Sequence, residues 1–188
     1  MKRYILPSIK ITLVFTLLLC VLYPLFISFV GKLSKGQGSG EKVYANGKVV
    51  GYKLIGQSFT QPNYFWGRPS AAGYNAASSA GSNKGPTNTD YLKEVSNRID
   101  TLLKYHPGLR KSEIPAEMVT ASGSGLDPNI SVASAQMQAK RIAKYRQIPL
   151  SRVLKLIETY TEQPFLGLFG PSKINVLSLN IALDKINK

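Results

Sequence analysis

The chain has 188 residues, of which 44% are hydrophobic, and a formal net charge of +14. Without an N-terminal membrane segment about 150 residues remain, enough for one domain with its own core. Five basic residues precede the first acid, Glu41, so the later part carries only +9 (19 basic minus 10 acidic residues). This moderate excess favours anionic surfaces and does not indicate nucleic acid. The single cysteine, Cys20, excludes an intramolecular disulfide and a cysteine-based metal site.

The first long apolar run predicts a membrane anchor. Residues 11–30 contain no charge, and twenty residues at about 1.5 Å each match a hydrocarbon core of about 30 Å. A cleaved signal peptide is the alternative, but the run is longer than a usual signal peptide allows and no clear Ala-x-Ala site follows. Basic residues before the run favour a cytoplasmic N-terminus, residues 1–10, and an extracytoplasmic main domain in a bacterial cell membrane.

Beyond the anchor the pattern predicts a single small α+β domain over residues 46–188. Residues 31–45 are rich in Gly, Ser and Lys and are expected to form a tether. Asn88 or Thr89 can cap the first helix of the domain, and Ser151 can cap the third. Apolar spacing predicts helices at 90–105, 131–146 and 151–160, strands at 47–59, 115–121 and 174–179, and a long loop at 61–88.

The sequence offers little for catalysis. The only histidine, His106, stands between a predicted helix end and Pro107, where we interpret it as a cap; a Ser-His-Asp hydrolase would depend on this one residue. Residues 81–87 lack the order of a phosphate-binding loop and are interpreted as a plain turn. We expect no metal site and no covalently bound cofactor.

The glycine-rich run 122–131 (SGSGLDPNIS) is a better candidate for anion binding, because it precedes the predicted helix 131–146. Asp127 would lie at the mouth of that helix and repel a phosphate, so we favour a tight capped turn. Gln138 and Arg141 lie three apart, on the face expected to be polar, where they either recognise a ligand or face solvent or a subunit. Arg68, beside Tyr64, Phe65 and Trp66, either supports its loop by a cation–π contact or meets a partner.

Several motifs together resemble the KdpC family, the C subunits of Kdp potassium-transporting ATPases. The resemblance covers nearly the whole chain, and its motifs occur in the family's order. They are GQSFTQPNYFWGRPS (56–70), AGYN (72–75), GSNKGPTN (81–88), SGSGLDPNIS (122–131), QAKRIA (138–143) and NVLSLNIALD (175–184).

The resemblance implies a non-catalytic accessory subunit that is needed for assembly and acts as a catalytic chaperone. Its partners would be membrane lipid, a channel-like A subunit, an ATP-hydrolysing B subunit whose ATP affinity it raises, and a small F subunit. The family is often described as binding ATP. The residues implicated as nucleotide or partner contacts are Ser122, Gly123, Ser124, Gly125, Asp127, Gln138 and Arg141, and the loop candidates for partner contact are Gln57, Tyr64, Phe65, Arg68, Asn83 and Asn88.

One conflict and one alternative function remain at this point. An extracytoplasmic domain would meet little ATP, so direct ATP contact conflicts with the predicted topology. An anchored module that binds cell-wall glycan or anionic polymer through Tyr64, Phe65 and Trp66 is the other function that the residues allow.

Overall fold

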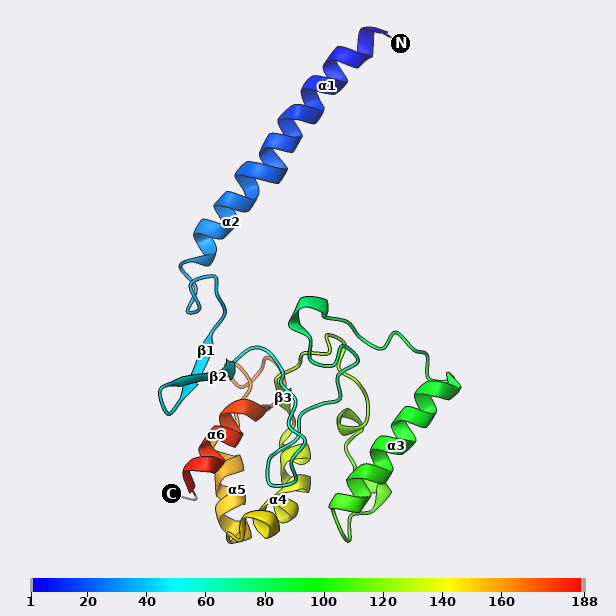
Figure 1. The fold of residues 1–188 in the computed structure, drawn as a ribbon, viewed down its shortest axis with the longest axis vertical. Coiled ribbons are helices and arrows are strands. Elements are labelled where there is room, and N and C mark those ends of the chain that lie inside the picture. Colours follow the sequence, from blue (N-terminus) through cyan, green and yellow to red (C-terminus); the bar gives the residue numbers. More distant parts are fainter. Residues whose placement is uncertain (1, 187–188) are drawn as a thin grey trace. The chain divides into compact units, whose positions relative to one another are not determined.

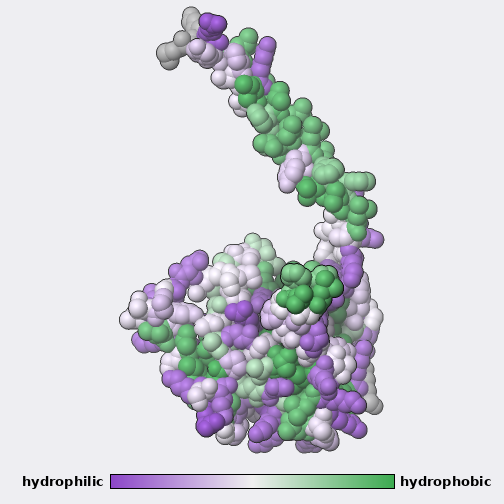
Figure 2. Space-filling view, turned by 180° about the vertical axis from the view of Figure 1, so that it is seen from behind, coloured by the Kyte–Doolittle hydropathy of each residue, from purple (hydrophilic) through white to green (hydrophobic). Residues whose placement is uncertain are grey.

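The computed structural model describes residues 2–186, which divide into two compact units at Lys42–Val43 (Figure 1). Within residues 2–186 one helix, Arg3–Gly31, is long and apolar enough to cross a membrane. It begins before the predicted run, so most of residues 1–10 are helical. Figure 2 shows this helix as a nearly continuous hydrophobic rod with polar residues at its start.

The long apolar helix consists of α1 (Lys2–Leu17), a π-helical turn (Leu18–Leu22) and α2 (Tyr23–Gly31). The N–H of Tyr23 bonds to the carbonyl of Leu18, five residues back. Pro24 follows directly and has no N–H to offer the preceding turn. The π-turn therefore absorbs the proline without ending the helix.

The second unit begins with a hairpin of β1 (Lys42–Ala45) and β2 (Lys48–Tyr52). Asn46 and Gly47 connect the strands with φ of 51° and 76°. Two positive φ values are what a two-residue hairpin turn requires, and Asn-Gly supplies them. The predicted tether is therefore wrong at residues 42–45, and the predicted strand 47–59 ends at Tyr52.

Two of the predicted helices are confirmed almost to the residue. These are α3 (Thr89–Tyr105), where the Asn88 side chain accepts from Tyr91 N, and α4 (Val132–Arg146), where Ser131 accepts from Ser134 N. The third, α5 (Leu150–Thr159), starts one residue early and has no side-chain cap, so the expected cap at Ser151 is wrong.

The predicted strand 115–121 is wrong, and the predicted strand 174–179 is right only at its first two residues. Residues 116–118 form a 3₁₀ turn after Pro115. The predicted strand 174–179 is limited to β4 (Ile174–Asn175), which pairs antiparallel with β3 (Asn129–Ile130), and α6 (Val176–Ile186) follows at once. The Asn175 side chain accepts from Ser178 N and so starts the helix.

The core lies where α4, α5 and α6 pack together, with α5 in contact with both neighbours (Figure 1). Small alanines on α4 let the helices approach closely, and larger residues fill the space between them. Phe65, from the long loop 61–88, is fully buried in the same core. The fully buried apolar side chains with it include Ala135, Ile142, Val153, Ile174, Leu179 and Leu183.

Candidate functional site

The aromatic segment of the long loop is held by side-chain amides rather than by a neighbouring strand. Asn180 on α6 accepts from Phe65 N (2.8 Å) and donates to Phe65 O (3.0 Å). Gln138 on α4 does the same for Trp66, at 2.7 Å from N and 3.1 Å from O. Because both amides are buried, each replaces the hydrogen bonds that water would otherwise give this backbone.

Arg141 is the centre of the buried network. Its Nη2 donates to Gln138 Oε1 (2.7 Å), its Nε donates to His106 Nε2 (3.0 Å), and its Nη1 donates to the carbonyl of Pro62. The guanidinium also lies over the Trp66 ring, with Cζ 4.1 Å from the ring centroid. One arginine thus connects α4, the end of α3 and the aromatic loop.

The charges in this network are set by burial. Burial lowers the pKa of Arg141 to about 10, which still leaves the guanidinium charged near neutral pH. Burial also lowers the pKa of His106 below 6.5; the hydrogen bond to Leu102 opposes this shift and the Arg141 charge adds to it. A neutral His106 whose Nδ1–H donates to Leu102 O (2.8 Å) leaves Nε2 free to accept from Arg141.

The predicted role of His106 as a helix cap is confirmed, since it occupies the C-cap of α3. Both ring nitrogens have partners, Leu102 O and Arg141 Nε. A general base needs a free nitrogen to accept a proton from its nucleophile. This geometry therefore gives no support to a hydrolase built on His106.

The glycine-rich turn packs against residues 69–80 of the loop. Ser122 N donates to Pro69 O (3.1 Å), and the hydroxyls of Ser70 and Ser79 donate to the carbonyls of Gly125 (2.6 Å) and Ser124 (2.8 Å). A Cβ at Gly125 (φ +68°) would lie 2.7 Å from the carbonyl of Ala80. Gly123 and Ser124 alone of the candidate residues in this turn are exposed.

Asp127 does not lie at the mouth of α4 as predicted. It forms an ion pair with Arg68 (3.0 Å) and accepts from Asn129 N (2.9 Å). Glu117 takes the predicted place, because it accepts from Ser131 N (2.8 Å) and from the hydroxyl of Ser134. Burial acts to raise the pKa of Glu117, but these hydrogen bonds outweigh it and keep the pKa below its usual value.

The two parts of the predicted nucleotide set contact different stretches of the loop. Gln138 and Arg141 do lie together as predicted, but both are buried and contact residues 62–66, so the expectation of a polar surface is wrong for this pair. The turn 122–127 contacts residues 68–80.

Most of the loop candidates for partner contact have partners within the domain. Tyr64 donates to Asp184 (3.1 Å) and lies under Arg146, and Phe65 is fully buried. Arg68 pairs with Asp127, so the cation–π contact expected of it is made by Arg141 instead. Asn88 caps α3, Gln57 donates to Tyr52 O (3.5 Å), and Asn83 is exposed. Within the aromatic cluster only Phe65 is fully buried; Tyr64 and Trp66 stay partly exposed, and Trp66 also lines a pocket of about 340 Å³.

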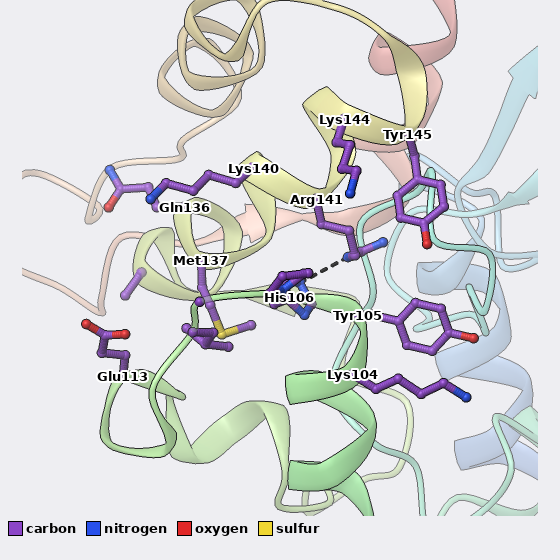
Figure 3. A pocket seen from close by; sticks show the side chains of 14 residues that line it. Lys104, Tyr105, His106, Glu113, Gln136, Met137, Lys140, Arg141, Lys144 and Tyr145 are labelled. Atoms are coloured by element: carbon purple, nitrogen blue, oxygen red, sulfur yellow. Dashed lines mark hydrogen bonds between the residues drawn. The ribbon is translucent and has the colours of Figure 1, made fainter.

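A basic cleft of about 620 Å³ lies beside the network, between the end of α3 and α4. Figure 3 shows Lys140 and Lys144 on α4, Lys104 and Tyr105 at the end of α3, and the Arg141–His106 bond between the two helices. Four cationic side chains line the cleft against one carboxylate, Glu113, which pairs with Arg110 (2.6 Å). Such a lining suits an anion.

Sequence reasoning missed this cleft. The spacing of four between Lys140 and Lys144 places them on one face of α4 and was a readable signal. The approach of Lys104 depends on tertiary packing and had no such signal. Within residues 2–186 no three His, Cys, Asp or Glu side chains gather closely enough to hold a metal ion.

The family described as "KdpC: K+-transporting ATPase, c chain" matches residues 5–185. The chain belongs to the KdpC family. A KdpC subunit of a potassium-transporting ATPase from Flavobacterium johnsoniae is 56% identical, over 95% of this chain and 96% of its own length. KdpC relatives from Bacteroides fragilis (52%; 98% of each chain) and Polaromonas naphthalenivorans (46%; 99% of this chain, 96% of the relative) agree.

The motifs that resemble the KdpC family meet in the fold. The family run 56–70 supplies Phe65 and Trp66, and the runs 138–143 and 175–184 supply the amides and the arginine that hold them. The apolar N-terminal helix and these relatives fit a membrane-anchored protein.

Proposed function

We propose that this chain is the non-catalytic accessory subunit of a Kdp-type ATPase that takes up potassium. It is needed for assembly with a channel-like A subunit, an ATP-hydrolysing B subunit and a small F subunit, and it raises the ATP affinity of the B subunit as a catalytic chaperone. The observation that carries the proposal is similarity of 46–56% identity, along almost the whole chain, to proteins named as KdpC subunits of potassium-transporting ATPases.

The polar groups of the site support a structural role. Gln138, Arg141 and His106 form their hydrogen bonds with groups of this chain, including the backbone of residues 62–66. A substrate would have to break these bonds to reach the same atoms. The network instead fixes a long loop in one conformation, which suits a surface that partner subunits recognise.

We further propose that the domain is extracytoplasmic and acts on the B subunit indirectly. The basic N-terminus of the membrane helix supports a cytoplasmic start. The turn 122–127 has its Ser122, Gly125 and Leu126 amides occupied by internal acceptors. An unfilled phosphate cradle would need such amides free. The effect on ATP affinity would then pass through the packing of the complex.

Purification of the complex tests the accessory role. The A, B and F subunits are expressed with and without the full chain, isolated through a tag on A, and assayed for yield and for the KM for ATP. Omission should reduce the yield of intact complex or raise the KM for ATP, and restoring the chain should reverse both. Equal yield and equal KM without the chain would refute the proposal.

Cysteine accessibility tests the topology. In a Cys20→Ser background the exposed Ser78 is replaced by Cys, and intact cells or spheroplasts receive a membrane-impermeant maleimide. Labelling before lysis supports an extracytoplasmic domain. Labelling only after lysis would place the domain inside, and Gly123 and Ser124 would then have to be tested for contact with ATP.

A further inference from the structure

Residues 164–170 form a hairpin-like loop with an apolar tip. Its stem is closed by antiparallel bridges between Glu162 and Lys173 and between Phe165 and Phe169. Between these stem charges, residues 163–172 carry no charged side chain. The four large apolar side chains of the tip face outward, with exposed fractions of 71% for Phe165, 74% for Leu166, 81% for Leu168 and 64% for Phe169.

The backbone of this loop is arranged to hold these side chains outward. Leu166 has φ of 54°, an uncommon conformation for a residue with a branched side chain, and Gly167 and Gly170 also have positive φ. A contiguous group of exposed Phe and Leu side chains is uncommon on a soluble surface and marks a contact with another apolar phase. The tip is therefore shaped for a contact outside the domain.

The base of the loop lies beside the β1–β2 hairpin, the first element of the domain. The stem of the loop continues into β4, where Asn175 Nδ2 donates to Lys53 O (2.8 Å) just after β2. In Figure 1 the orange segment before α6 accordingly lies next to β2. The β1–β2 hairpin is the first element after the membrane helix, and its Tyr44 and Leu54 are also exposed.

We propose that the tip, residues 164–170, inserts into the headgroup–acyl boundary of the bilayer that the N-terminal helix spans. Ten residues, 32–41, join that helix to β1, so the chain keeps the hairpin within about 35 Å of the membrane surface. The uncharged tip can enter the boundary without burying a charge, because the stem charges Lys173 and Glu162 lie outside the tip and pair with each other (3.8 Å).

This second membrane contact rests on the anchoring part of the proposed function and not on the chaperone role. A bilayer is favoured over a partner protein as the occupant because the anchor guarantees its presence and because the tip lacks the polar groups that fix the register of a protein interface. Insertion of the tip would hold the domain in a fixed orientation on the membrane surface.

The test uses the full chain reconstituted alone into phosphatidylcholine–phosphatidylglycerol vesicles. In a Cys20→Ser background, Leu168→Cys carries an environment-sensitive fluorophore; Leu92→Cys, an exposed leucine on α3, is the matched control. Emission at position 168 should shift to shorter wavelength and be quenched by lipids with spin labels near the headgroup, while position 92 should show neither effect. Equal spectra at both positions, without lipid quenching, would overturn the proposal.

A double variant, Phe165→Ser with Phe169→Ser, provides a second measurement. It should abolish the lipid quenching at position 168 and leave the unfolding temperature unchanged, because both side chains are exposed. Undiminished lipid quenching would contradict insertion of the tip. If the shift at 168 occurs only when the other Kdp subunits are added, and without lipid quenching, the occupant is a protein and the proposal fails. Because the vesicles contain no other subunit, this result is independent of the assembly assay.

Discussion

Replacement of Gln138 by leucine should be the most damaging single change in the polar network. Leucine has a similar volume, so the cavity is small and the loss comes from hydrogen bonds. The Trp66 N–H and Arg141 Nη2 lose their acceptor, at 2.7 Å each, while the Trp66 carbonyl loses its donor. Two buried donors left unpaired cost about 1–3 kcal/mol each, so we expect a loss of about 2–6 kcal/mol.

The sequence supplies both the reporter and the control. Trp66 is the single tryptophan, so urea unfolding of the full chain in detergent can be followed by its fluorescence. With a slope of about 2 kcal/mol per M, the midpoint of Gln138→Leu should fall by about 1–3 M. Gln136→Leu, on the exposed side of α4, should stay within about 0.5 kcal/mol of the parent. Equal midpoints for the two variants would refute the reasoning.

Three further predictions concern His106, Gly125 and Arg146. Because the pKa of His106 is lowered from 6.5, the unfolded chain binds this proton more readily than the folded chain. The contribution of His106 to the free energy of unfolding should therefore be complete above pH 6.5 and decrease as the pH drops below it. Unfolding midpoints measured from about pH 8 to about pH 5.5 should show this decrease in the parent and not in His106→Gln. Gly125→Ala meets both a positive φ and a 2.7 Å approach to a carbonyl and should lower the free energy of unfolding by about 2 kcal/mol or more, whereas Gly123→Ala, with open space, should not; equal midpoints would contradict this. Arg146→Met should cost about 2 kcal/mol because that largely buried side chain bonds a backbone carbonyl and an aspartate, while Arg110→Ala, whose ion pair is exposed, should change the midpoint little.

Local signals predicted α3, α4 and α5 well, whereas α6 was predicted as a strand. Asn88 and Ser131 stand one residue before α3 and α4 and cap them, and His-Pro-Gly ends α3. The error at 174–179 has a local cause too, because Asn175 acts as a cap and residues 176–183 keep helical spacing. The Asn46-Gly47 turn was readable and was missed.

The site could not be predicted in the same way. Gln138 and Arg141 are polar residues on a helix, and such residues are usually exposed. They are buried because they bond to backbone groups of a loop far away in the sequence. Every residue type has such backbone groups, so the sequence does not indicate which of them a side chain will contact. Motif resemblance pointed to the right residues, but only the fold assigned them to holding the loop.

The two hydrogen bonds between Asn180 and the Phe65 backbone also limit how early this part of the domain can fold. Asn180 lies 115 residues after Phe65, on the last helix of the described chain. At about 5–20 residues per second, the loop waits roughly 6 to 23 s after its own synthesis for the amide that holds it. The Trp66 backbone can meet Gln138 as soon as α4 has been made, but the Phe65 backbone lacks its partner until α6 is complete. The segment around Phe65 is therefore the last part of the loop to gain its side-chain hydrogen bonds during synthesis.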